Sequence, residues 1–282
     1  MATEIDVQDV EYVRHATGPL LARVFRPRGA GPFPLIVDLH GGAWCRGDRT
    51  NDTILNEPLA KSGVVVVALD FRQPPVAGYP ASMADINYAI RWLKSRAAGF
   101  NTRADMIGVM GISSGGHQGM LNAMRPRDPR YTAIPLPGSD VDATVRCAIL
   151  CWPVIDPLGR YQYAKNLKAG GAPYPEVVDR VLPAHDLYWP GEDAMEEASP
   201  VRILERGEWV EPLPPVLYIQ GTRDQAHPRS HLDRFVELYR KAGGQVELEL
   251  LEGEAEGFIA KSPAAAQKTI ARIIDFVHKE LG

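Results

Sequence analysis

A short glycine-flanked serine motif places the strongest constraint on the fold of this chain. It reads Gly111-Ile112-Ser113-Ser114-Gly115 and has the form G-x-S-x-G. The apolar run MIGVM ends directly before it, and a segment able to form a helix, HQGMLNAM, follows shortly after. Strand, tight turn and helix in this order are typical of a nucleophile elbow. We therefore predict that Ser113 is a nucleophile, flanked by glycines because a Cβ there would collide with neighbouring backbone.

Segments with strand and helix character alternate along most of the chain. Residues 11–25 alternate apolar and polar side chains, with a break at Gly18-Pro19, which predicts an antiparallel hairpin. Helical patterns at residues 81–97, 230–242 and 264–281 lie between apolar runs that are typical of strands covered on both faces. These runs are PLIVDL, VVVVALDF, MIGVMG, VRCAILCW, PVLYIQG and VELELLEG. The alternation predicts an α/β protein with a mostly parallel central sheet and helices on both faces.

The stretch from residue 156 to residue 215 interrupts this alternation. It is rich in proline, aromatic and charged residues, and helical periodicity is weak, around residues 175–182. Connections of this length usually have a function or contain small elements of their own. We predict a cap or lid over a pocket, inserted into one core formed by residues 1–155 and 216–282. The alternative is a peripheral excursion that only covers the sheet.

The net charge and composition of the chain indicate which binding partners and which cellular compartment to expect. The formal net charge of -4 gives no reason to expect nucleic acid or an anionic membrane surface. The acidic start, MATEIDVQDVEYVRH, lacks the apolar core of a secretory signal, and the apolar runs are too short for a bilayer, so we expect a cytoplasmic protein. Cys147 and Cys151 fall on an apolar run and are predicted to be small core residues. We expect no metal and no cofactor, and the sequence leaves the oligomeric state open, a homo-oligomer included.

A second glycine motif, HGGAW, follows the apolar run PLIVDL. Glycines at the end of a strand let backbone N–H groups approach a substrate oxygen, which is what an oxyanion hole requires. We predict that Gly41, Gly42 and the N–H of Ser114, the residue after the nucleophile, supply these donors. His40 precedes the turn and is predicted to brace the loop rather than to act as a base.

HGGAW, GISSGG, the later GTRD and the DFR of residues 70–72 together resemble the esterase branch of the α/β-hydrolase superfamily. The resemblance is to the hormone-sensitive-lipase-like and arylformamidase-like carboxylesterases, and it covers nearly the whole chain in the expected order. It implies an α/β-hydrolase fold and hydrolysis of a carboxylic ester or amide through an acyl-enzyme on Ser113. In that family the acid of the catalytic triad follows a late strand, and Asp224, after PVLYIQGTR, matches that position.

The chain departs from this family at the catalytic histidine. The family places the histidine after the last strand, in a stretch that reads G-x-x-H-G-F, whereas residues 253–258 of this chain read GEAEGF. The resemblance then implies that Glu256 stands at the base position and shares a proton with Asp224, because two close carboxylates resist both being ionised. His227, three residues beyond Asp224, and His185, in the predicted cap, are the alternative bases.

A glutamate at the base position leads to three functional hypotheses. The first, which we take as the leading one, is a serine hydrolase with an atypical triad in which Glu256 is the base. The second is an ordinary esterase inactivated by the substitution, and the third is a small-molecule-binding protein that kept the pocket without turnover. Non-hydrolytic chemistry such as acyl transfer stays open as well.

Aromatic side chains are the only sequence signal for the substrate. We predict that Trp44, Tyr188 and Trp189 contact it, which favours a small ester or amide with an apolar or aromatic portion. Further aromatic residues of the predicted cap are Tyr161, Tyr163 and Tyr174. The alternative is that these rings pack the cap onto the sheet.

Overall fold

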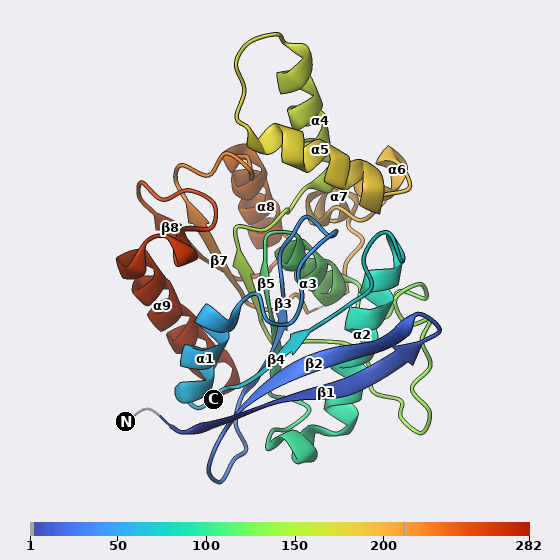
Figure 1. Cartoon of the computed structure of the whole chain (residues 1–282), viewed down its shortest axis with the longest axis vertical. Helices are drawn as coiled ribbons and strands as arrows, with labels where there is room; N and C mark the ends of the chain where they lie inside the picture. Colours follow the sequence, from blue (N-terminus) through green and yellow to red (C-terminus); the bar gives the residue numbers. More distant parts are fainter. Residues whose placement is uncertain (1–2, 211) are drawn as a thin grey trace.

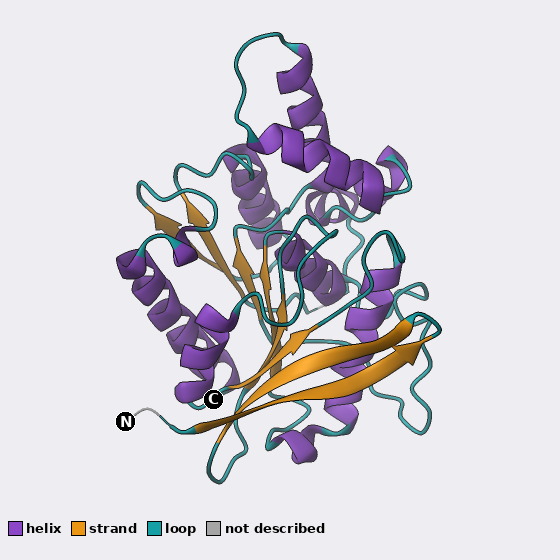
Figure 2. Cartoon of the chain, viewed as in Figure 1, coloured by secondary structure: helices purple, strands orange, loops and turns teal. Residues whose placement is uncertain are grey.

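A twisted β-sheet forms the centre of this computed structural model, which describes residues 3–210 and 212–282 (Figure 1, Figure 2). Over these residues the sheet has eight strands in the spatial order β1-β2-β4-β3-β5-β6-β7-β8. β2 pairs antiparallel with β1 and β4, and all other neighbours pair parallel, so the predicted mostly parallel sheet is confirmed. The strands are β1 Ile5–His15, β2 Gly18–Pro27, β3 Leu35–Leu39, β4 Val65–Leu69, β5 Ile107–Ile112, β6 Ala148–Cys151, β7 Val216–Gly221 and β8 Val246–Leu251.

The antiparallel part of the sheet is the hairpin predicted for residues 11–25, and it is longer than predicted. β1 and β2 pair from Ile5 opposite Pro27 to His15 opposite Gly18. Gly18 has a φ of +127°, a conformation that side chains other than glycine rarely adopt, which explains the glycine at this turn. The hairpin is the dark blue ribbon that crosses the lower part of Figure 1.

Helices cover both faces of the sheet, because successive residues of a buried strand point to opposite faces. Leu35 and Val37 of β3 pack with α2, α3 and α8 on one face, whereas Ile36 packs with α1 and α9 on the other. The second face also buries Cys147 and Cys151, in the core positions predicted for them. The helices are α1 Thr53–Lys61, α2 Ala81–Ser95, α3 Ser114–Met124, α8 Arg229–Lys241 and α9 Pro263–Leu281, with short 3-10 helices at Ala97–Phe100 and Phe258–Ala260.

The three helices predicted from periodicity correspond to α2, α8 and α9, and their ends differ from the prediction by one or two residues. The apolar stripe of α2 is fully buried against the sheet. Within the ranges that the structure describes, no helix is both long and apolar enough to cross a membrane.

The segment 156–215 contains four helices within its described residues: α4 Pro157–Ala169, α5 Val177–Tyr188, α6 Glu192–Glu197 and α7 Pro200–Arg206. α4 and α5 pack on each other through Ala164, Val178 and Val181, and they project beyond the sheet at the top of Figure 1. α7 packs instead against α3 and α8. The segment therefore has two parts with different surroundings, and its treatment as one cap insertion stays a prediction.

Candidate active site

Ser113 stands on the sharp turn between β5 and α3, as the glycine-flanked motif predicts. Its φ of +51° lies in the left-handed region, which is sparsely populated for residues other than glycine. A Cβ on Gly111 would lie 2.3 Å from the carbonyl oxygen of Gly115, and a Cβ on Gly115 would lie 1.9 Å from the carbonyl oxygen of Leu39. Both glycines are therefore required by the close approach of the backbone, and the turn presents the serine at the end of a central strand.

The Ser113 hydroxyl is hydrogen-bonded to a histidine. The distance from Ser113 Oγ to His227 Nε2 is 3.1 Å, and the distance from His227 Nδ1 to Asp224 Oδ2 is 2.9 Å. With its Nδ1 proton donated to Asp224, the ring keeps the Nε2 lone pair for the serine O–H. Both side chains are almost fully buried. These contacts join a hydroxyl, an imidazole and an ionised carboxylate in one chain of hydrogen bonds, an arrangement that can activate a serine as a nucleophile.

The loop between β7 and α8 builds the histidine–aspartate part of the site. Asp224 Oδ1 accepts the backbone N–H groups of Ala226 and His227, at 2.8 and 3.0 Å. The side chain of Gln220 donates to the carbonyl oxygen of His227 at 2.8 Å. Burial by itself raises the pKa of Asp224, but the charge and hydrogen bond of His227 and the two backbone donors outweigh it and hold that pKa below its usual value. The carboxylate is therefore ionised at neutral pH.

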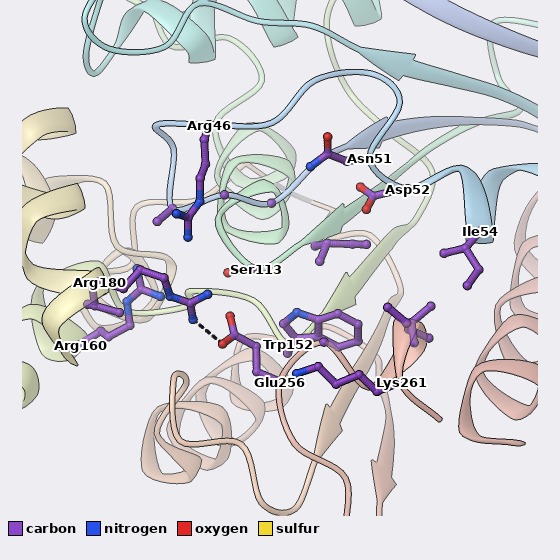
Figure 3. Close-up of a pocket in the computed structure, with 18 residues that line it drawn as sticks. Arg46, Asn51, Asp52, Ile54, Ser113, Trp152, Arg160, Arg180, Glu256 and Lys261 are labelled. Atoms are coloured by element: carbon purple, nitrogen blue, oxygen red, sulfur yellow. Dashed lines mark hydrogen bonds and ion pairs between the residues drawn. The ribbon is translucent and has the colours of Figure 1, made fainter. Parts of the chain in front are cut away.

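Glu256 lies elsewhere, and the prediction that it contacts Ser113 and shares a proton with Asp224 is wrong. Its carboxylate forms an ion pair with Arg180 of α5, 2.5 Å between Oε2 and Nη2 (Figure 3). Asp224 uses its oxygens for His227 and the loop backbone instead. The side chain that is hydrogen-bonded to Ser113 comes from the loop after β7 rather than the loop after β8. The hypotheses of an inactivated esterase and of a binding protein therefore lose their premise, which was a missing base.

The other buried histidines near the site have partners of their own. His185 Nδ1 lies 2.8 Å from the carbonyl oxygen of Val181, one turn earlier in α5. His117 lies between the carbonyl oxygen of Ala198 and the indole N–H of Trp44, and burial lowers its pKa to about 4. Neither ring is hydrogen-bonded to Ser113 in the described residues, so His185 is not the substitute base.

The loop after β3 lies against Ser113. A Cβ on Gly41 would lie 3.5 Å from Ser113 Cβ, and a Cβ on Gly42, where φ is +114°, would overlap the carbonyl oxygen of Arg46. His40 stacks on Phe71 with 4.3 Å between ring centroids, and its Nδ1 lies 2.7 Å from the Gly41 carbonyl oxygen, so it braces this loop. Ser114 is the first residue of α3. The assignment of Gly41, Gly42 and Ser114 as oxyanion donors stays a prediction.

A pocket of about 320 Å³ opens over Ser113. Figure 3 shows Arg160 of α4 and Arg180 of α5 on one side of Ser113, and Trp152 and Ile54 on the other. The pocket therefore has a cationic end, lined by the helices α4 and α5 that project beyond the sheet, and an apolar end formed by Trp152 and Ile54, beside which Asp52 and Lys261 also lie. Its lining is completed by Gly41, Gly42, Ala43, Arg46, Asn51, Asp52, Ile112, Val181, Glu256, Gly257, Ile259, Ala260 and Lys261.

The prediction that three aromatic residues contact the substrate is wrong for this pocket, because its lining does not include Trp44, Tyr188 and Trp189. They are buried together, with Trp44 stacked on Tyr188 at 5.3 Å between centroids and perpendicular to Trp189. The Tyr188 hydroxyl is hydrogen-bonded to Ser82 at 2.6 Å. The alternative stated from the sequence, that these rings pack the inserted segment onto the core, describes them correctly. Trp152 lines the pocket instead, and its sequence context, the end of an apolar strand, did not distinguish it from a core residue.

Known proteins resemble this chain over most of its length. Esterase LipC of Mycobacterium tuberculosis is 29% identical over 88% of this chain and 59% of its own length. The probable carboxylic ester hydrolase LipM of the same organism is 31% identical over 76% of this chain and 47% of its own. The chain thus spans about half to three-fifths of these two relatives.

Solved structures share the fold. An esterase of Pyrobaculum calidifontis superposes with a TM-score of 0.79 over 99% of this chain and 87% of its own, at 22% identity. The predicted α/β-hydrolase fold and the resemblance to its esterase branch are confirmed. The BD-FAE family model matches residues 24–237, which is well over half of the sequence. The chain therefore belongs to the BD-FAE family.

Proposed function

We propose that this chain hydrolyses carboxylic esters through an acyl-enzyme on Ser113, with His227 as general base and Asp224 as the acid that orients it. The observation that carries the proposal is the continuous chain of hydrogen bonds from Ser113 Oγ through His227 to Asp224, at 3.1 and 2.9 Å. The names of LipC and LipM, an esterase and a probable carboxylic ester hydrolase, support an ester rather than an amide as substrate.

The reaction follows from the positions of these three groups. His227 Nε2 takes the proton of Ser113 as Oγ attacks the carbonyl carbon, and the ionised Asp224 stabilises the imidazolium that forms. His227 then gives the proton to the oxygen of the leaving alcohol as the ester bond breaks. Water repeats the sequence against the acyl-enzyme, and the products are one carboxylic acid and one alcohol.

The loop after β3 and the start of α3 supply the donors for the oxyanion. The carbonyl oxygen becomes negative when Oγ attacks, and backbone N–H groups stabilise it best in a site that is arranged beforehand. Gly41 lies against Ser113, and the N-terminus of α3 brings the positive end of a helix dipole to the same place. The bracing of this loop by His40 holds the donors in position.

The two ends of the pocket suit different parts of the substrate. The apolar end, which includes Ile54, Ile112 and Trp152, suits a short apolar acyl chain. The proposed substrate therefore still has the apolar portion that the sequence predicts, but the residues that contact it differ from those predicted.

Hydrolysis of p-nitrophenyl acetate and butyrate, with kcat/KM measured at pH 7 to 8, tests the proposal. The parent is expected to be active, and Ser113→Ala and His227→Gln should each lose at least about 10²–10⁴-fold. The matched control is His278→Gln, an exposed histidine of α9, which should retain the parent rate. An organophosphonate probe should label the parent and fail to label Ser113→Ala. Activity that survives His227→Gln would show that another group is the base.

A further inference from the structure

Arg160 is a buried arginine that lines the pocket without a counter-ion. Its residue is 3% exposed, and its Nε and Nη2 atoms have no hydrogen-bond partner among the described residues. Its third nitrogen, Nη1, lies 3.5 Å from His227 Nε2, at the outer limit of a hydrogen bond. The single lone pair of that nitrogen already accepts the closer Ser113 hydroxyl. The guanidinium is therefore buried with its donors essentially unused, which is costly unless a ligand engages them.

The carboxylates whose charge acts on Arg160 are Glu256 and Asp224. Glu256 is hydrogen-bonded to Arg180, and Asp224 to His227 and its loop backbone, so neither carboxylate forms an ion pair with Arg160. The other carboxyl group of the pocket is Asp52, whose pKa is raised well above its usual value by burial and by Asp38, so it contributes little negative charge. Burial lowers the pKa of Arg160 to about 9, which leaves it cationic at neutral pH.

Two further cations line the same pocket. Arg46 and Lys261 are exposed and form no ion pair among the described residues, and Figure 3 shows the Arg46 side chain directed toward Ser113. The field inside the pocket is therefore positive, and it favours an anionic ligand.

The place of Arg160 in its helix adds to this preference. It lies in the first turn of α4, which begins at Pro157 and is capped by Asp156 through a 3.0 Å bond from the N–H of Gly159. The N-terminus of a helix carries partial positive charge, so a cation in the first turn is unfavourable and an anion there is stabilised. One face of the guanidinium lies over the Trp44 ring, 5.2 Å from its centroid. The planar fork of a guanidinium matches a planar anion such as a carboxylate.

The contact with His227 decides which part of the substrate carries the charge. His227 Nε2 gives its proton to the leaving oxygen, and Arg160 Nη1 lies beside that same nitrogen. We infer that the preferred substrates are esters of short hydroxycarboxylic acids, whose carboxylate lies on the alcohol portion and is bound by the Arg160 guanidinium. The inference rests on the proposed function. The carboxylate must lie within a few bonds of the leaving oxygen, because only His227 stands between the Arg160 guanidinium and Ser113 Oγ in the chain of contacts.

A pair of nearly isosteric substrates tests the inference. Acetoxyacetate carries a carboxylate on its alcohol portion, and acetoxyacetamide replaces that carboxylate with a neutral amide. We expect the kcat/KM of the parent, measured by acetate release, to be about 10 to 100-fold higher for acetoxyacetate than for acetoxyacetamide. This is the range expected for hydrogen bonds to a charged group. The control pair is monomethyl succinate, which carries its carboxylate on the acyl portion, and its neutral amide, methyl succinamate. The parent should hydrolyse these two esters with similar kcat/KM. A preference for the amide, or a preference confined to the acyl-side pair, overturns the inference.

Arg160→Gln should reduce the acetoxyacetate to acetoxyacetamide ratio of kcat/KM to near one. Arg160→Lys keeps the charge without the planar fork and should give an intermediate ratio. The matched control is Lys165→Gln, which removes an exposed cation from the same helix and should leave the ratio at its parent value. A ratio that Arg160→Gln leaves intact shows that the arginine is a structural residue solvated by water, and the inference fails.

Binding measurements keep the inference separate from the proposed function and from folding of the Arg160 variants. Calorimetry on Ser113→Ala should show binding of acetoxyacetate at least tenfold tighter than that of acetoxyacetamide. Equal affinities overturn the inference even if the parent hydrolyses p-nitrophenyl esters. Tighter binding of acetoxyacetate, in a parent that hydrolyses no ester, supports the anion site while the proposed function fails.

Discussion

His227 donates from Nδ1 to Asp224, 2.9 Å away and only three residues earlier in the chain. One short loop after β7 therefore contains both the base and the acid of the proposed triad. The same carboxylate also accepts two backbone N–H groups of that loop, so the position of the base depends on local hydrogen bonds rather than on contacts between distant segments.

Replacement of Asp224 by asparagine should separate charge from shape. Asp224→Asn keeps the size of the side chain but removes the charge that stabilises the imidazolium, and it permits the wrong tautomer of His227. We expect kcat for p-nitrophenyl acetate to fall about 10²–10⁴-fold with little change in the melting temperature. Asp233→Asn, an exposed residue of α8, is the control and should retain activity. An Asp224→Asn variant within about fivefold of the parent would contradict the triad.

Glu256 provides the converse test. Its ion pair with Arg180 is partly exposed, and such pairs contribute only about 0–1 kcal/mol to the free energy of unfolding. Glu256→Gln should therefore retain kcat/KM for neutral p-nitrophenyl esters within about tenfold, unlike a base, whose loss costs about 10²–10⁴-fold. Glu256→His should bring no gain, because His227 is already hydrogen-bonded to Ser113. A gain of orders of magnitude from Glu256→His would restore the hypothesis of an inactivated esterase.

The sequence predicted the parts of this molecule that local pattern determines. The turn at Ser113 was predicted because a serine between glycines, after an apolar run and before a helix, has few other conformations. Asp224 was identified through the resemblance to the esterase family, in which the acid follows a late apolar strand. Each of these inferences depends on residues close together in the chain, and each agrees with the structure.

The features that the sequence did not predict depend on which distant segments meet. Glu256 occupies the position of the family's histidine, but its environment is decided by Arg180 of α5, 76 residues away. The spacing of three residues between Asp224 and His227 was the one signal that pointed to the histidine hydrogen-bonded to Ser113. Arg160 belongs to a helix with many polar residues, and its burial follows only from the packing of α4 beside the loop of His227.

The oxyanion loop should be sensitive to one added methyl group. Gly42 has a φ of +114°, and a Cβ there would lie 1.9 Å from the carbonyl oxygen of Arg46, so Gly42→Ala must displace the loop. We expect kcat to fall about 10²–10³-fold, the cost of an oxyanion donor, with a smaller change in KM. Gly99→Ala is the control, because a Cβ at Gly99 meets no atom within 4 Å. Parent-like kcat in Gly42→Ala would remove this loop from the oxyanion hole.

A buried carboxyl group under the site should make stability depend on pH. Burial raises the pKa of Asp38 to about 7, partly offset by the side chain of Asn56, which donates to it at 2.7 Å. Between about pH 4 and pH 7 the folded state therefore keeps a proton on Asp38 that the unfolded chain has released. The contribution of Asp38 to the free energy of unfolding is present below about pH 4 and is lost as pH rises to about 7. Asp38→Asn should reduce that loss by roughly a few kcal/mol, and the remainder belongs to Asp52, whose pKa is also raised by burial. Urea unfolding of both proteins at pH 5 and pH 8 measures it, and parallel losses in parent and variant would contradict the assignment.

The apolar end of the pocket, rather than the buried aromatic cluster, should select the acyl chain. Ile54 lines that end and is 49% exposed, so Ile54→Trp can fill space there without disturbing the core. We expect kcat/KM for p-nitrophenyl octanoate to fall about tenfold or more relative to acetate, because a longer chain meets the new ring. Tyr188→Phe is the matched comparison, since it removes the hydroxyl bonded to Ser82 and should cost about 1 kcal/mol of stability while the octanoate to acetate ratio stays constant. A ratio that changes in Tyr188→Phe and not in Ile54→Trp would return the aromatic cluster to the substrate site.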